Sequence, residues 1–144
     1  MAATPTVLLR TDYVVLTQEH DGKIIRYRRT AVPFPMLQVA QQVYEHVLAV
    51  YERIGRRGRG LLVDSRDAVG RNDPEFEKLL LSFRDRAIPG FAAHVILMRT
   101  AVGILQAQRI DRSLRSDRKA YLTTDNEDDA IRFLLQQLDA RSSA

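Results

Sequence analysis

Residues 61–64 read Leu61-Leu62-Val63-Asp64, and residues 73–76 read Asp73-Pro74-Glu75-Phe76. The first run is continuously apolar and too short for a helix, which is typical of a strand buried on both faces of a sheet. The second run indicates a helix start, with Asp as the N-cap and Pro at the first helical position. Together they predict a buried strand followed by a helix.

The sequence before residue 61 predicts a hairpin and a helix. An extended segment from Val7 to Leu16 precedes His20-Asp21-Gly22-Lys23, and a return strand follows from Ile24 to Thr30. Asp-Gly between two apolar runs favours a hairpin turn. Apolar residues then recur at helical spacing from Met36 to Ile54, and Gly55 stands where a C-cap is expected.

The sequence after residue 76 predicts two more strands and two more helices. The second helix ends at Pro89-Gly90, a strand covers Ala92 to Met98, and a helix runs from Thr100 to about Leu114. A short strand at 120–122 and a helix beginning at Asn126 complete the chain. The order β-β-α-β-α-β-α-β-α predicts an α/β fold with four helices and a mixed sheet of about five strands, opened by an antiparallel hairpin.

Length and composition narrow the class of protein. The 144 residues fit one domain, residues 1–144, with an ordered core at about 7–138. The chain has no cysteine, which excludes disulfides, thiolate metal sites and a cysteine nucleophile. The first six residues lack the pattern of a secretory signal, and no apolar stretch approaches the ~20 residues of a membrane helix. We therefore expect a cytoplasmic protein without membrane insertion.

The predicted element order from Val7 to Leu138 resembles the STAS fold, in particular the SpoIIAA-like group (STAS/SEC14). Three segments carry the resemblance: Leu61 to Asp64, the Asp-headed helix at Asp73, and the acidic start of the last helix at 125–134. The resemblance implies a regulatory or protein-interaction module. Anti-sigma-factor antagonists carry a phosphorylatable serine at the head of the second helix, and residues 73–76 contain no hydroxyl. A phosphorylation switch at that turn is therefore not expected.

The third predicted helix is apolar on two sides, and its sheet can cover only one of them. Exposed apolar patches mark interaction sites, and in STAS-like proteins the second and third helices form a common partner surface. We therefore predict a surface for another protein or a second copy of the chain; the alternative is that this segment is partly irregular. The predicted interface consists of Leu81, Arg84, Ile88, Ile104, Ile110 and Leu114.

A second candidate site follows the ends of the two central strands. Asp64 and Ser65 follow one predicted strand, and Arg99 and Thr100 follow the next, where open α/β sheets bind ligands. Arg99 and the free N–H groups of a helix start suit an anion, although most such loops are simply solvated. Two alternatives remain: an enzyme that uses Asp64, Ser65 and Arg99, and a binder of a small apolar ligand. The apolar ligand is expected in a gap between the sheet and Phe34, Met36 and Tyr44.

Other functional classes have weaker support. His20, His46 and His94 are scattered without metal-ligand spacing, so we expect no metal, no cofactor and no catalytic residue. The net charge is +4, and arginines cluster at 53–59 and 109–118. Both clusters lack the aromatic residues that stack on bases, so nucleic-acid binding is not expected. The leading hypothesis is a non-enzymatic regulatory or protein-interaction module.

Overall fold

The first three strands form an antiparallel meander. β1 (Thr6–Arg10) pairs with β2 (Val14–Glu19), which pairs with β3 (Ile24–Arg29). The turn between β2 and β3 contains His20, Asp21 and Gly22, all with positive φ. The hairpin predicted from Asp-Gly is therefore confirmed, because these residue types tolerate left-handed backbone.

The segment 7–16, predicted as one strand, is divided into two. Thr11 causes the break, since its Oγ1 accepts hydrogen bonds from the backbone N–H groups of Tyr13 (3.1 Å) and Val14 (2.9 Å). A threonine side chain that bonds nearby backbone in this way favours a turn over a continuous strand. The sheet consequently has six strands, not about five.

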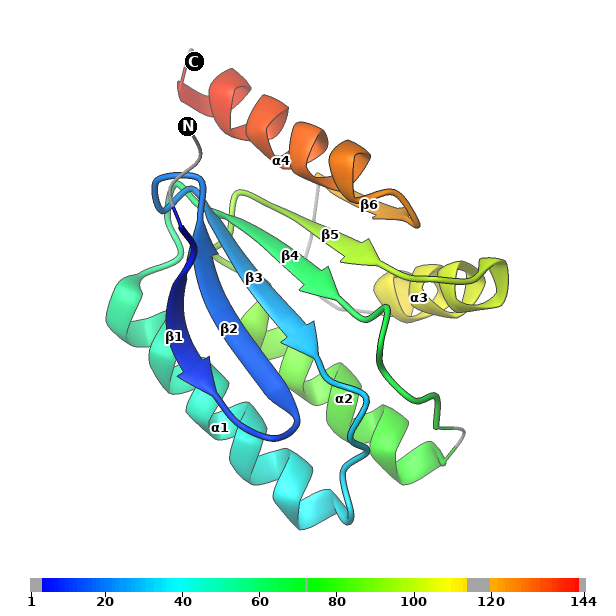
Figure 1. Ribbon diagram of the computed structural model, residues 1–144. Helices are drawn as coiled ribbons and strands as arrows, with labels where there is room; N and C mark the ends of the chain where they lie inside the picture. Colours follow the sequence, from blue (N-terminus) through cyan, green and yellow to red (C-terminus); the bar gives the residue numbers. More distant parts are fainter. Residues whose placement is uncertain (1–3, 72, 114–119, 143–144) are drawn as a thin grey trace.

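The computed structural model describes residues 4–71, 73–113 and 120–142, which form one mixed sheet with four helices (Figure 1). β3, β4 (Gly60–Asp64), β5 (Ala93–Leu97) and β6 (Tyr121–Thr124) pair in parallel, and the strand order is β1-β2-β3-β4-β5-β6. The helices are α1 (Leu37–Ile54), α2 (Pro74–Ala87), α3 (Ala101–Ser113) and α4 (Glu127–Ser142). The predicted α/β fold class is confirmed.

Short polar side chains begin three of the helices. Asp73 Oδ1 accepts from the N–H of Phe76 at 2.7 Å, and Thr100 Oγ1 accepts from that of Gly103 at 3.0 Å. Asn126 Oδ1 accepts from Asp129 N–H at 2.9 Å in the same way. These N-caps satisfy backbone donors that have no partner inside the helix, so the predicted helix starts are confirmed.

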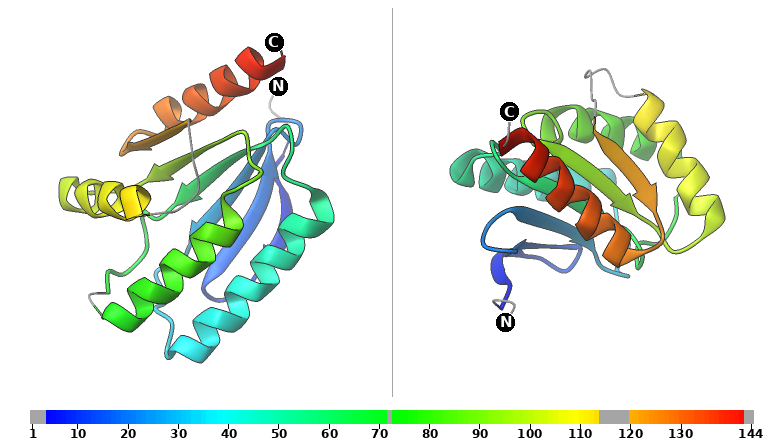
Figure 2. Two further views of the ribbon diagram at one scale, coloured as in Figure 1. Left: turned by 180° about the vertical axis from the view of Figure 1, so that it is seen from behind. Right: turned by 90° about the horizontal axis from the view of Figure 1, so that it is seen from above.

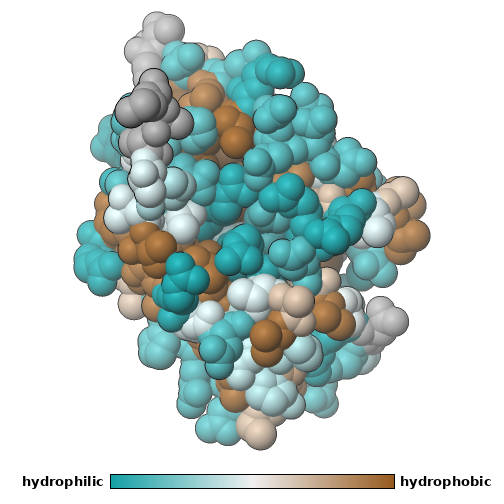
Figure 3. Space-filling view, in the orientation of Figure 1, coloured by the Kyte–Doolittle hydropathy of each residue, from teal (hydrophilic) through white to brown (hydrophobic). Residues whose placement is uncertain are grey.

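The helices cover the two faces of the sheet unequally. α1 and α2 cover one face, and α4 lies on the other face over β4, β5 and β6 (Figures 1 and 2). α3 lies at the edge of the sheet, next to β6. The strands β1 to β3 therefore have one face without a helix, and a band of hydrophilic surface crosses the middle of this side of the molecule (Figure 3).

Alternation along β4 divides the core into two layers. Leu61 and Val63 face α1 and α2, whereas Leu62 packs with Leu134 of α4 on the opposite face. Gly60 lets α4 approach closely, since a Cβ at that position would lie 2.9 Å from Leu134 Cδ2. In the described ranges, none of the helices is long and apolar enough to cross a membrane.

Candidate functional site

A cavity of about 380 Å³ lies between the sheet, α2 and α3. Its volume falls in the lower part of the range of about 300–1,000 Å³ that is typical of small-molecule sites. The walls come from β3, β4, three helices and the loops that follow β4 and β5. The principal lining residues are Tyr27, Arg29, Tyr44, Tyr51, Leu61, Val63, Ser65, Arg71, Phe76, Glu77, Leu80, Phe83, Arg84, Met98, Gln106, Ala107, Arg109 and Ile110.

Small residues on α3 create this space. Gly103 and Ala107 are buried on the inward side of the helix, one helical turn apart. Gly103 allows close contact with the end of β5, because a Cβ there would lie 2.9 Å from Met98 Cε. Neither residue carries a side chain that reaches α2, so a volume between the two helices remains free.

Aromatic rings form much of the cavity wall. The rings of Tyr44 and Phe83 stack with centroids 4.1 Å apart and an interplanar angle of 8°, and Tyr27 lies 5.8 Å from Phe83. Burial raises the pKa of Tyr27, Tyr44 and Tyr51 above the ordinary value, so these phenols are neutral at physiological pH. The wall thus offers apolar ring faces together with O–H groups.

Three of the four arginines that line the cavity have partners. Arg29 donates to the carbonyl oxygens of Tyr13 (3.1 Å) and Val32 (3.3 Å). The other two pair with carboxylates, Arg71 with Asp73 and Arg109 with Glu77. Hydrogen bonding and ion pairing offset the desolvation of these guanidinium groups.

Arg84 is different. Arg84 is 8% exposed, and its Nη1 atom is buried without a hydrogen-bond partner among the described residues. Its charge opposes the rise in the pKa of Tyr27 and Tyr44 that burial causes, which places the guanidinium near both phenols. A buried charge without a partner is costly, so Arg84 is the exceptional group of this cavity.

The predicted protein interface does not form one exposed surface. Arg84 and Ile88 (3% exposed) are both buried. Ile88 follows Arg84 by four residues, so the two side chains lie on the same side of α2, and this side faces inward. Ile110 lines the cavity, and Leu81 and Ile104 are half-buried. The exposed apolar residues of α3 are instead Val102 (65%) and Leu105 (64%), since packing turns Gly103 and Ala107 inward. Leu114 lies outside the described residues.

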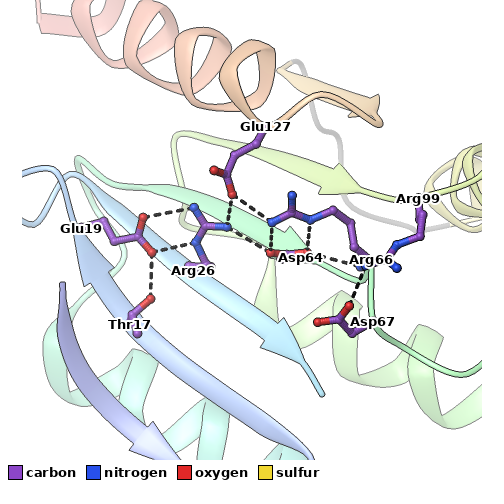
Figure 4. Close-up of polar contacts among 8 residues, drawn as sticks. All are labelled: Thr17, Glu19, Arg26, Asp64, Arg66, Asp67, Arg99 and Glu127. Atoms are coloured by element: carbon purple, nitrogen blue, oxygen red, sulfur yellow. Dashed lines mark hydrogen bonds and ion pairs between the residues drawn. The ribbon is translucent and has the colours of Figure 1, made fainter. Parts of the chain in front are cut away.

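The predicted anion site is divided among different partners. Asp64 is 2% exposed and pairs with Arg26 (3.0 Å) and Arg66 (2.7 Å), whereas Arg99 pairs with the exposed Asp67 at 2.7 Å (Figure 4). The N-cap of α3 is Thr100, and Ser65 lines the cavity. The carboxyl ends of the strands are adjacent, but the polar groups at these ends interact with different residues and do not form one anion site.

The free space does not lie beside Phe34 and Met36, where the apolar gap was predicted. Phe34 is buried against Tyr44 with ring centroids 5.7 Å apart, and Met36 is 54% exposed. Of these three residues, only Tyr44 lines the cavity. The free space lies on the α2–α3 side because Phe34 itself fills the volume next to the start of α1.

A cluster of charged residues occupies the opposite face of the sheet (Figure 4). Arg26 of β3 pairs with Glu19 of β2 (2.7 Å) and with Glu127 at the start of α4 (2.8 Å), in addition to Asp64. Arg66 bridges Asp64 and Glu127, the latter at 2.9 Å. Each of the three carboxylates has a guanidinium partner, so the cluster joins α4 to three strands instead of presenting a free charge.

Acid is expected to destabilise the protein through this cluster as the pH falls below about 4. Burial alone would raise the pKa of Asp64, but hydrogen bonds from Arg66 and the charges of Arg66 and Arg26 lower it overall. The hydrogen bond from Arg26 is the main cause of the lowered pKa of Glu127. The unfolded chain therefore binds protons at a higher pH than the folded chain, and the stabilisation present at neutral pH is lost in acid.

Urea unfolding at a series of pH values from neutral to acidic measures this loss. The Asp64→Asn variant should show a smaller decrease in stability between neutral and acidic pH, because one titrating carboxylate has been removed. Equal pH dependence in both proteins would contradict the assignment.

Comparison of the chain with protein-family models, curated proteins and solved structures found no match. In the part of the chain that the structure describes, no cluster of three or more His, Asp or Glu side chains is placed to hold a metal ion. The site is therefore interpreted from its geometry. Sequence reasoning identified Arg84, Ile88 and Ile110 as important but placed them on an outer surface; the spacing of Gly103 and Ala107 was the signal for an inward face with free space.

Proposed function

We propose that this protein is a non-enzymatic domain that binds a small, largely apolar molecule in the cavity between α2, α3 and the sheet. The observation that carries the proposal is the cavity of about 380 Å³ with its aromatic wall. An apolar cavity with a few converging polar groups is the usual form of a small-molecule site.

The titratable groups of the cavity favour binding over catalysis. Burial keeps the lining tyrosines protonated, and Glu77 is paired with Arg109. General acid–base catalysis needs a group whose pKa lies near the operating pH and which can reach the substrate. Among the described lining residues there is no histidine to supply one.

The STAS-like relationship is part of the same proposal. Its support is the element order and the hairpin that opens the sheet. The head of α2, where anti-sigma-factor antagonists carry a serine, contains Asp73 as N-cap and Pro74 and Glu75 in the first turn. A ligand-dependent role in place of a phosphorylation switch is consistent with that turn.

Ala107→Phe is expected to weaken binding of the neutral fluorescent probe N-phenylnaphthylamine by at least about tenfold, equivalent to ~1.4 kcal/mol. Ala107 is 5% exposed and lines the cavity, so a phenyl ring there occupies the space that the probe needs. Because the ring enters an existing void, we expect the variant to fold with normal stability. Fluorescence titration measures the affinity, and thermal unfolding checks the fold.

Leu105→Phe is the matched control on the outward side of the same helix. Leu105 is 64% exposed, so the added ring meets solvent and probe binding should not change. If the wild-type protein binds no probe, or if both variants bind it equally well, the cavity is not a ligand site.

A second candidate is the interaction role predicted from the sequence, here as a homodimer through α3. Its support is that Val102 and Leu105 are 65% and 64% exposed, and hydrophobic surface is visible at the edge of the molecule over α3 (Figure 3). Exposed apolar surface of this kind is typical of an interface. The molar mass in solution, measured with and without Leu105→Asp, tests it; a single-chain mass in both proteins would count against a dimer.

A further inference from the structure

We infer that the ligand carries one acidic group, of the carboxylate type, which pairs with Arg84 inside the cavity. This inference rests on the proposed function and specifies its ligand class as an amphipathic monoanion. The observation behind it is independent of the cavity volume: Arg84 is 8% exposed, lines the cavity, and has a buried Nη1 that no described residue accepts a hydrogen bond from.

The cost of burying a charge makes this arrangement informative. A guanidinium group remains protonated in proteins, so it cannot avoid desolvation by losing its proton. Proteins ordinarily place such a group against a carboxylate or a set of carbonyl oxygens. No carboxylate of the described residues forms an ion pair with Arg84, so a ligand that brings the missing acceptor would remove the cost.

The hydrogen bonds of the neighbouring arginines indicate how many acidic groups the cavity can hold. Arg29 is bonded to carbonyl oxygens, Arg71 to Asp73 and Arg109 to Glu77. Arg84 is therefore the lining guanidinium, among the described residues, whose buried Nη1 still lacks an acceptor. One carboxylate supplies that acceptor, whereas the second negative charge of a dianionic phosphate would be buried without a further free guanidinium donor.

The surroundings of Arg84 suit a carboxylate held by several donors. The planar guanidinium can donate two parallel hydrogen bonds to one carboxylate. The charge of Arg84 acts on the phenols of Tyr27 and Tyr44, which hydrogen-bond to each other, so this pair keeps one O–H group as a further donor. The rest of the ligand would contact the faces of the aromatic rings and aliphatic residues such as Leu80, which favours an apolar body.

The test is displacement of N-phenylnaphthylamine by octanoate, octanol and octyl phosphate at neutral pH. Octanoate and octanol share the same chain and differ in the acidic group, so their ratio of affinities isolates the contribution of the charge. In the wild-type protein we expect octanoate to bind at least about tenfold more tightly than octanol, and more tightly than octyl phosphate.

Arg84→Met and Arg86→Met form a matched pair of variants. Each removes one positive charge from α2, but the Arg86 side chain is 57% exposed, pairs with Glu45 and lies outside the cavity lining. Arg84→Met should abolish the preference for octanoate while octanol still binds. Arg86→Met should keep the preference.

The outcomes separate the two proposals. If neither octanoate nor octanol displaces the probe, or the probe itself does not bind, the proposed function fails. If octanol binds as tightly as octanoate in the wild-type protein, or if Arg86→Met removes the preference as fully as Arg84→Met does, the ligand-binding function stands and the role of Arg84 is wrong. Tighter binding of octyl phosphate than of octanoate would overturn the assignment to a monoanion.

Discussion

Replacing Asp64 by Asn is expected to lower the free energy of unfolding by about 3 kcal/mol. The carboxylate is 2% exposed and accepts hydrogen bonds from Arg26 at 3.0 Å and from Arg66 at 2.9 and 2.7 Å. Removal of one member of a buried charge pair costs about 3–5 kcal/mol, because the partner charge stays buried. The lower end applies here, since Glu19 and Glu127 still neutralise Arg26.

Asp67→Asn provides the control for this experiment. Asp67 lies three residues further along the chain and pairs with Arg99 at 2.7 Å, but both side chains are well exposed to solvent. Exposed ion pairs contribute between about 0 and 1 kcal/mol, so this variant should unfold almost as the wild type does. Urea denaturation followed by circular dichroism measures both. If Asp64→Asn has as little effect as Asp67→Asn, the cluster does not stabilise the contact between α4 and the sheet.

Replacing Arg84 by Met is expected to have the opposite effect on stability to Asp64→Asn. We expect it to raise the free energy of unfolding by about 1–3 kcal/mol. The guanidinium is removed from water on folding, and its Nη1 gains no hydrogen bond in return. Methionine matches the aliphatic part of the arginine side chain, carries no charge and adapts to irregular apolar surroundings. The same urea experiment, performed without added ligand, detects the change.

Arg29→Met is the matched control because Arg29 is also 8% exposed and also lines the cavity. Its guanidinium donates to two carbonyl oxygens and lies 4.1 Å from the centre of the Phe34 ring. Loss of these contacts should destabilise the protein. If Arg84→Met is destabilising to the same degree, Arg84 has a structural role and its burial does not indicate an acidic ligand.

A stabilising Arg84→Met variant that no longer distinguishes octanoate from octanol would show a trade-off between stability and function. Binding sites commonly retain groups that lower the stability of the ligand-free protein, because a ligand supplies their missing partner. Octanoate should then stabilise the wild-type protein more than the Arg84→Met protein, since only the folded wild type offers the charge.

Local chemistry made much of the fold predictable. Asp73 and Thr100 indicate helix starts because a short polar side chain can accept a hydrogen bond from a backbone N–H group two or three residues later. This interaction is local and does not depend on tertiary contacts. The hairpin at Asp21-Gly22 follows from backbone that tolerates positive φ. The break at Thr11 was missed because the same residues suit an extended strand unless the threonine side chain turns back onto the backbone.

The candidate site was less predictable. Arg84, Ile88 and Ile110 were identified from the sequence, but as an outer surface. In the structure, all three residues line the cavity, and Ile88 also belongs to the core on that face of the sheet. A helical repeat shows which residues share a side of a helix, and it carries no information about what that side faces.

The amino-acid sequence alone predicted the α/β class, the turn at 20–22 and the order of the helices and strands, except for the division of residues 7–16 into β1 and β2, because these features depend on neighbours a few residues apart. Tertiary structure decided which side of α3 faces inward, since that depends on how Gly103 and Ala107 pack beside β5 and β6, which are formed by separate parts of the chain. It also decided that the Nη1 of Arg84 is buried without a hydrogen-bond partner among the described residues, because the groups around a buried side chain come from distant parts of the chain.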